Sequence, residues 1–192
     1  MNRIVHYLPC SIVCHGECEL VLVKQIQSKK RRDLNPLSRD SGGHPIMINT
    51  INSFLYSKYP DRKLYIKSNK DRLCLGKDKE IVNHKIFTIM DKDDASDDLF
   101  ESYKNKDLFK DYWWGQDNLI VPIYFVPNMD TVFSKHGFPI DTKGKKPAQF
   151  FKYLTTQYDS VIDMLRSLRP NESNISELLN YLDEIKNNTY KK

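Results

Sequence analysis

Two aspartates that follow an apolar segment are the residues of this sequence best suited to chemistry. Asp91 and Asp93 come directly after Lys85–Met90, whose apolar residues predict a buried strand. Carboxylates at positions i and i+2 beyond a strand can share one divalent cation, and oxygen ligands of this kind suit Mg²⁺ or Mn²⁺. Such metal ions commonly assist reactions of phosphate groups. The pair therefore predicts a metal site that acts on a phosphate substrate.

A second polar segment follows another predicted strand. Ser11–Cys14 is short and apolar, and Gly16 ends it. A helical pattern begins next, with Glu17 and Glu19 in its first turn, where acidic residues are favoured by the helix dipole. The segment therefore predicts a strand, a tight turn and a helix.

If the two strands are neighbours in one parallel sheet, their carboxyl ends meet at the same edge, where α/β proteins usually bind ligands. Glu19, Asp91 and Asp93 would converge there as metal ligands, with Asp94 and Glu17 as further candidates. A lysine beside the scissile phosphate would offset its developing negative charge. Lys145 is taken for this role, with Lys143 and Lys146 as alternatives.

The elements that must position these residues alternate between strands and helices along the chain. We expect further strands at 34–38 and 119–126, a helix that carries Ile46 to Tyr56, and helices at 150–165 and from 176 onward. Pro122 favours a sheet edge or a strand start for this part of the strand 119–126, and disfavours the centre of a sheet. The pattern predicts an α/β fold with a parallel sheet of about four strands flanked by helices. Residues 1–146 form the α/β domain, with an insertion at about 61–84, and residues 147–192 form a helical extension packed on it.

The composition argues against a disulfide-rich, secreted or membrane-spanning protein. The 192 residues carry a net charge of +5, which permits nucleic-acid binding without requiring it. Four cysteines do not make a disulfide scaffold, and the N-terminus does not read as a signal peptide. The longest apolar runs are far shorter than the roughly 20 residues that span a bilayer. We therefore expect a soluble, cytoplasmic protein.

Charge is unevenly distributed. Basic clusters lie at Lys29–Arg32 and at 143–146, and the run Asp91–Asp98 holds five carboxylates. Basic clusters around an acidic pocket suit a site that grips a polyanion and holds a cation at its centre. Each run is also compatible with an ordinary solvated face.

The turn Cys14–Glu19 and the later strand with its Asp-x-Asp pair resemble the Toprim domain superfamily. That pattern is an apolar strand, then Glu-Gly, then an acidic residue at a helix start, and later Asp-x-Asp after another strand. Within that superfamily, this small domain without ATPase or primase regions most resembles the RloB-like and overcoming-lysogenization-defect-type nucleases of phage defence. The resemblance covers about residues 8–126 and implies a Rossmann-like fold and a Mg²⁺- or Mn²⁺-dependent nuclease.

Individual positions carry the resemblance to different degrees. Asp91 and Asp93 match Asp-x-Asp, and Glu19 matches the acidic residue at the helix start. His15 stands where the family has the glutamate of Glu-Gly, a residue implicated in metal binding or proton transfer. Histidine can perform either task near neutral pH. The departure leaves two interpretations: an altered but active nuclease, or a catalytically impaired module that binds nucleic acid, a partner ATPase or a phage component.

Other motifs receive simpler interpretations. Cys10, Cys14 and Cys18 lack a second pair at zinc-ligand spacing, and Cys10 and Cys14 are interpreted as small buried residues. The run from Asp91 fails the EF-hand calcium pattern. Trp113–Trp114 are interpreted as core or interface residues, and His136 as structural. The C-terminal helices also offer a surface for a homo-oligomer.

Overall fold

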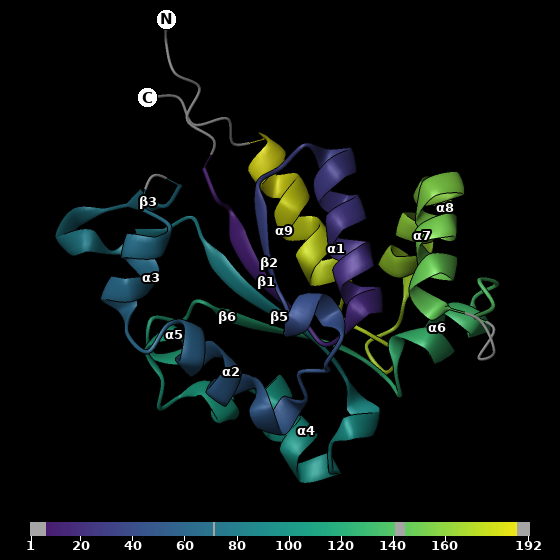
Figure 1. The fold of residues 1–192 in the computed structure, drawn as a ribbon, viewed down its shortest axis with the longest axis horizontal. Coiled ribbons are helices and arrows are strands. Elements are labelled where there is room, and N and C mark those ends of the chain that lie inside the picture. Colours follow the sequence, from purple (N-terminus) through teal and green to yellow (C-terminus); the bar gives the residue numbers. More distant parts are fainter. Residues whose placement is uncertain (1–6, 71, 141–144, 188–192) are drawn as a thin grey trace, which may run out of the picture.

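The structure is a computed structural model that describes residues 7–70, 72–140 and 145–187. A four-stranded parallel sheet lies at its centre, in the order β2-β1-β5-β6 (Figure 1). The strands are β1 Cys10–Cys14, β2 Leu34–Leu37, β5 Lys85–Asp91 and β6 Ile120–Phe125. Helices flank both faces of the sheet, which confirms the predicted α/β, Rossmann-like architecture.

Prolines mark the two edges of the sheet. Pro36 lies in β2 and Pro122 in β6, and each of these strands pairs with one neighbour only. Proline has no N–H to donate to a ladder, so it is tolerated at a sheet edge. The edge position predicted for the strand that contains Pro122 is confirmed.

The sheet separates two apolar cores, because alternate side chains of each strand point to opposite faces. Ile12, Cys14, Phe87 and Ile89 pack against the helices of one face, and Val13 belongs to the core of the other. The first face is covered by α1 Glu17–Lys30, α6 Met129–Lys135, α7 Lys146–Thr156, α8 Tyr158–Ser167 and α9 Ser176–Asn187. The second face is covered by α2 Ile51–Lys58, α3 Arg62–Ser68, α4 Asp97–Lys104 and α5 Trp113–Gln116.

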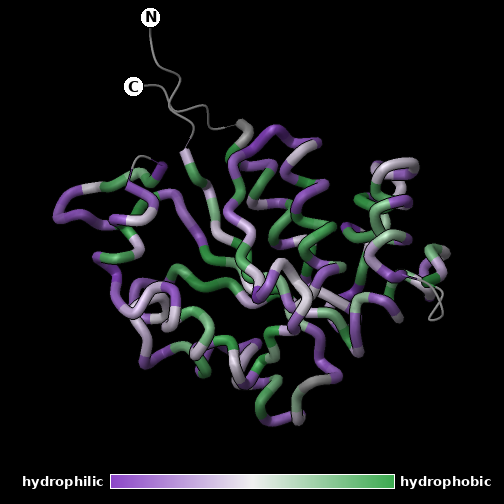
Figure 2. Tube along the Cα trace, in the orientation of Figure 1, coloured by the Kyte–Doolittle hydropathy of each residue, from purple (hydrophilic) through white to green (hydrophobic). Residues whose placement is uncertain are grey.

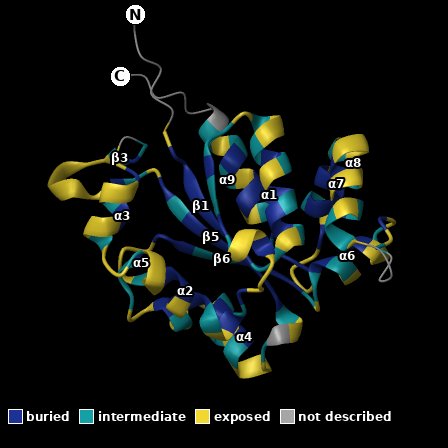
Figure 3. Ribbon diagram, viewed as in Figure 1, coloured by how far each residue is buried: buried dark blue, intermediate teal, exposed yellow. Residues whose placement is uncertain are grey.

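Burial and hydropathy follow this layered arrangement. The central strands are apolar and buried, whereas exposed and hydrophilic residues lie on the outer sides of the helices (Figures 2 and 3). Within the described ranges, no helix combines the length and the apolar character needed to cross a membrane.

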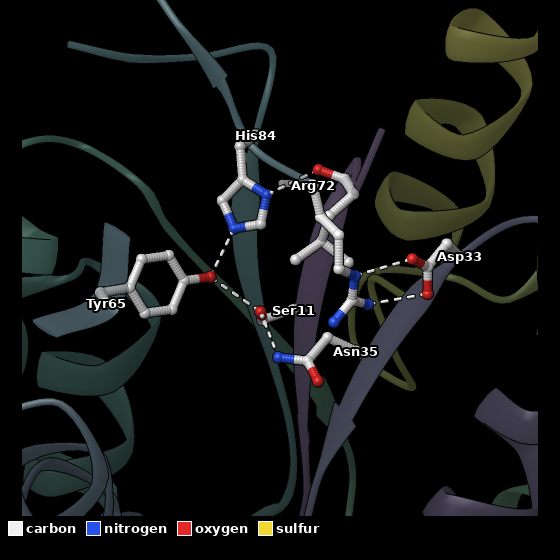
Figure 4. Close-up of polar contacts among 7 residues, drawn as sticks. Ser11, Asp33, Asn35, Tyr65, Arg72 and His84 are labelled. Carbon is white, nitrogen blue, oxygen red and sulfur yellow. Dashed lines mark hydrogen bonds and ion pairs between the residues drawn. The ribbon is translucent and has the colours of Figure 1, made fainter. Parts of the chain in front are cut away.

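The segment 61–84 contains α3 and a small antiparallel hairpin of β3 Cys74–Leu75 and β4 Ile81–Val82. A buried hydrogen-bond network ties this segment to the central strand β1 (Figure 4). The Tyr65 hydroxyl lies 2.7 Å from Ser11 Oγ and 2.6 Å from His84 Nε2. Beside it, Arg72 forms a two-pronged ion pair with Asp33, at 2.7 and 2.8 Å. The segment is therefore anchored to the sheet through polar side chains.

Two predicted helices have different bounds in the structure. The helix expected over 46–56 begins only at Ile51, after a short 3₁₀ turn at Ile48–Thr50. The helix expected over 150–165 is two helices, broken at Gln157, whose φ of −135° and ψ of 35° lie outside the helical region. The Thr155 and Thr156 hydroxyls bond to the carbonyls of Phe151 and Lys152, four residues earlier, a contact that often bends helices.

The C-terminal helix α9 lies directly on the sheet. Its Leu178, Leu179 and Leu182 belong to the core of the first face, and the Tyr181 hydroxyl donates to the Pro9 carbonyl at 2.8 Å. The helix therefore completes the layer over β1 and β5 together with α1.

Candidate active site

The candidate site lies at the carboxyl edge of the sheet, between β1 and β5. The chain leaves β1 toward β2 on one side, and β5 and β6 extend the sheet on the other, so this is the point where the strand order reverses. Ligands of parallel α/β sheets usually bind in the crevice at this point. A pocket of about 280 Å³ lies there. Its lining residues are His15, Gly16, Glu17, Cys18, Glu19, Asp91, Asp93, Asn128, Asp130 and Lys146.

Glu19 enters the pocket from the first turn of α1. Its Oε2 accepts the Gly16 N–H at 2.8 Å, which fixes the side chain across the helix start, and only 3% of the residue is exposed. Burial raises the pKa of Glu19, and the charge of Asp130 raises it further, against the lowering influence of His15 and nearby backbone N–H groups. Glu19 is therefore a buried acid that holds its negative charge at a cost.

Asp91 is the last residue of β5 and continues the row of Phe87 and Ile89 on one face of the sheet. Its Oδ1 accepts the Met129 N–H at 3.1 Å, and the residue is 9% exposed. Burial raises the pKa of Asp91 well above its ordinary value, and the charge of Glu19 is the next cause. The predicted convergence of Glu19 and Asp91 is therefore present in the structure.

Asp93 lies at the rim of the same pocket. It is exposed, and its Oδ2 accepts a hydrogen bond from Asn128 Nδ2 at 2.5 Å. The Asn128 Oδ1 accepts the Thr131 N–H at 2.9 Å, so Asn128 both caps α6 and orients Asp93. Asn128 thus joins the segment after β6 to the segment after β5.

His15 lines the pocket beside Glu19. Its Nδ1 lies 3.0 Å from the Ile46 carbonyl oxygen. A carbonyl oxygen only accepts, so Nδ1 carries a proton in this contact, and proton transfer or metal binding by the ring would have to use Nε2. Backbone bonds reinforce this placement, since Ile46 N–H donates to the His15 carbonyl at 2.8 Å.

The lysine at the pocket is Lys146, one residue beyond the predicted Lys145. Lys146 lines the pocket and forms an ion pair with Asp130, whose charge raises the pKa of Lys146. Lys145 is exposed, precedes the first turn of α7 and does not line this pocket. Lys143 lies outside the described residues.

The remaining predicted acids lie in different settings. Glu17 is exposed at the pocket rim. The backbone of Asp94 belongs to a 3₁₀ turn at Lys92–Asp94, but its side chain lies outside the described part of the structure. Lys92, between the two aspartates, turns away and bonds to Asp97 Oδ1 at 2.6 Å, as expected of a structural residue.

One wall of the pocket depends on a close backbone approach. Gly42, after β2, has φ of 92°, and a Cβ placed on it would lie 2.7 Å from the Glu17 Cα. Only glycine permits both the left-handed conformation and this distance. The loop after β2 is thereby held against the start of α1.

The first basic cluster is remote from the pocket, contrary to the expectation that both clusters surround it. Lys29–Arg32 lies at the far end of α1, whose 14 residues extend about 20 Å from Glu17. Lys30 pairs there with Asp183 of α9, and Lys29 lies over the Tyr158 ring at 5.4 Å. This cluster therefore connects α1 to α8 and α9.

The residues with simpler interpretations are placed as follows. Cys10 and Cys14 are buried and unbonded to other cysteines. Trp114 is fully buried, and Trp113 Nε1 donates to the Tyr59 carbonyl at 3.0 Å. His136 Nε2 lies 3.1 Å from Glu172 Oε1. These residues have structural partners in the fold.

The donor chemistry of the pocket fits magnesium. Among the described residues, no three His, Cys, Asp or Glu side chains are already grouped as metal ligands. Mg²⁺, however, is commonly held by one or two carboxylates, with water and substrate phosphate as its other ligands. Glu19 and Asp91 are two buried carboxylates, and the charge of Glu19 raises the pKa of Asp91, a conflict that a divalent cation would relieve.

Sequence reasoning missed two pocket residues, Asn128 and Asp130, and preferred Lys145 to Lys146. The signal for the first two was the position of Pro127–Asp130 directly after the strand next to β5, which brings that segment to the same sheet edge. Lys146 depends on how α7 packs along α1. No local pattern distinguishes it from Lys145.

Comparison of the chain with protein-family models, with curated proteins and with solved structures finds no match in any of the three.

Proposed function

We propose that the protein is a Mg²⁺- or Mn²⁺-dependent nuclease that hydrolyses phosphodiester bonds of nucleic acid, with a Toprim-like arrangement of its acidic residues. One observation carries the proposal. Glu19, from the first turn of α1, and Asp91, from the end of β5, are two buried carboxylates that line one pocket at the point where the strand order reverses. A bond to a backbone N–H accounts for each carboxylate separately, but not for the burial of both in one pocket, where the charge of Glu19 disfavours the ionisation of Asp91.

The proposal assigns metal binding, proton transfer and stabilisation of the phosphate charge to different residues of the pocket. Glu19, Asp91 and Asp93 would hold the metal, and Asn128 keeps Asp93 oriented. A bound magnesium ion supplies positive charge to a phosphate oxygen and makes a water molecule easier to deprotonate. His15, whose Nδ1 proton is held by the Ile46 carbonyl, accepts a proton at Nε2 in place of the glutamate expected from the Toprim pattern. Lys146 at the rim offsets charge on the phosphate.

The test is metal-dependent cleavage of single- and double-stranded DNA and RNA. Asp91→Asn keeps the size of the side chain and an oxygen for the Met129 N–H, but removes the charge. We expect cleavage with Mg²⁺ or Mn²⁺ and a loss of about 10³-fold or more in Asp91→Asn, equivalent to roughly 4 kcal/mol of barrier. Asp97→Asn is the matched control, because Asp97 is exposed, pairs with Lys92 and does not line the pocket.

A second candidate function is a binding module without catalysis. The contact that favours it is the bond from Gly16 N–H to Glu19, which gives Glu19 a helix-capping role independent of any metal. Calorimetry separates the two functions. Binding of Mn²⁺ and of nucleic acid without any cleavage would support the binding module over the nuclease. The variant His15→Glu would then test whether a carboxylate at this position produces cleavage.

A further inference from the structure

A second depression adjoins the candidate active site along α6. Its volume is about 500 Å³, and it shares Asn128, Asp130 and Lys146 with the acidic pocket. Because three residues line both hollows, the two are parts of one continuous surface groove. We call the second part the α6 groove; its remaining lining residues are Thr131, Ser134, Lys135 and Ile140.

The charge of the lining changes along this surface. Among the described residues, the acidic pocket is lined by five carboxylates, with His15 and Lys146 beside them. The α6 groove is lined by one carboxylate, Asp130, and by two ammonium groups, of Lys135 and Lys146. The acidic pocket therefore suits a cation. In the α6 groove Lys146 is paired with Asp130, whereas the partner of Lys135, Glu172, does not line the groove, so the exposed Lys135 is the group that suits this end to an anion.

The α6 groove also offers neutral hydrogen-bond donors. Thr131 and Ser134 lie three residues apart on α6, so their side chains are neighbours on the helix surface. Ser134 Oγ accepts the Ile140 N–H at 3.0 Å, and a hydroxyl that accepts one bond still has a proton to donate. Phosphate oxygens accept bonds from hydroxyl, amide and ammonium groups of this kind.

Lys135 is held in position at the outer end of the groove. Its ammonium bonds to Glu172, which His136 also contacts, while 64% of the lysine side chain stays exposed. Glu172 is buried and joined by its backbone to Val126 after β6. The lysine is therefore anchored to the core and still open to a ligand from solvent.

We propose that the α6 groove binds a second phosphate of the same nucleic-acid strand whose scissile phosphate lies in the acidic pocket, so that the substrate is a polymer and not a mononucleotide. The inference rests on the proposed function for the identity of the strand. Successive phosphates of a strand are spaced by a few ångströms along its axis, and the volume of the groove lies within the range of about 300–1,000 Å³ typical of ligand sites. A strand that runs along α6 would place its backbone over Lys146 and then Lys135.

The experiment measures binding separately from cleavage. A fluorescein-labelled 12-nucleotide single strand, as DNA and as RNA, is titrated in EDTA, and its anisotropy is followed at several salt concentrations. Lys135→Gln is expected to weaken binding about fivefold and to lower the slope of log K against log salt by about 1, as for one lost phosphate contact. Lys152→Gln is the matched control, because Lys152 is exposed on α7 and outside the groove.

Thr131→Val provides a second variant that removes a hydroxyl without a change of charge, and it too is expected to weaken binding. The inference is overturned if Lys135→Gln and Lys152→Gln weaken binding equally, since that would indicate only general charge attraction. It is also overturned if neither nucleic acid binds, or if 5′-AMP competes as well as an unlabelled 12-mer. If binding depends on the groove but no nucleic acid is cut, the proposed nuclease activity is contradicted and the proposed binding site in the α6 groove is supported.

Discussion

Two clusters of buried polar side chains, near opposite ends of β1, differ in how their charges and hydrogen bonds are matched. Ser11, Tyr65 and His84 lie near the start of β1, and the acidic pocket lies after its end. In the first cluster each polar atom meets a complementary one. In the second, two buried carboxylates share one pocket, and the charge of Glu19 raises the pKa of Asp91.

The hydrogen bonds of the first cluster have one consistent direction (Figure 4). His84 Nδ1 donates to the Leu8 carbonyl at 3.0 Å, which leaves Nε2 to accept from the Tyr65 hydroxyl. Tyr65 in turn accepts from Ser11, and Ser11 accepts from Asn35 Nδ2 at 3.0 Å. A neutral His84 satisfies every member, and such fully paired buried networks make the fold more specific.

The acidic pocket is matched only in part. Backbone N–H groups bond to Glu19 and Asp91, and His15 lowers the pKa of Glu19, but the charge of Glu19 raises the pKa of Asp91, and Lys146 is paired with Asp130. Burial with complementary partners indicates a structural role, whereas burial of like charges indicates a site completed by a ligand. This contrast predicts that substitutions in the two clusters change stability in opposite directions.

The largest expected effect on stability is the acid sensitivity of the His84 network. Burial lowers the pKa of His84 from 6.5 to about 4, so the unfolded chain binds a proton at higher pH than the folded one. The free energy of unfolding should therefore fall as the pH falls from about 6.5 to about 4, by roughly 3 kcal/mol. Urea unfolding of the wild type and of His84→Gln across this range measures the difference, and identical pH profiles would contradict the assignment.

A smaller loss is expected from Tyr65→Phe. The change keeps the ring but leaves Ser11 and His84 without their shared partner, which should cost about 2 kcal/mol. Cleavage should be unchanged, because the network lies away from the pocket. Tyr56→Phe is the matched control, since Tyr56 is 55% exposed and its loss of a hydroxyl should leave the melting temperature unaltered.

The smallest effect has the opposite sign. Burial and the charge of Glu19 raise the pKa of Asp91, so its ionised form destabilises the fold at neutral pH. In EDTA at pH 7, Asp91→Asn should raise the free energy of unfolding by about 1 kcal/mol. Addition of Mg²⁺ should stabilise the wild type but not the variant. If Asp91→Asn instead lowers the melting temperature, as Tyr65→Phe is expected to do, the proposed difference between the two clusters is contradicted.

The sequence by itself determined the elements whose signals are local. A short apolar run and a glycine predicted β1 and the start of α1, the apolar run before Asp91 predicted β5, and Pro122 favoured an edge for β6. The parallel topology then followed from strands that alternate with helices. These signals place Glu19, Asp91 and Asp93 at strand ends, and the pairing of β1 with β5 in the structure brings them to one pocket.

Only the tertiary structure decided the partners that come from distant parts of the chain. Asp130 reaches the pocket because β6 pairs with β5, and Lys146 reaches it because α7 packs on α1. The remoteness of Lys29–Arg32 likewise follows from the length and direction of α1. Short-range patterns record propensity and burial, whereas the matching of charges depends on contacts between residues far apart in sequence. The balance of charge in the pocket is therefore a property of the fold.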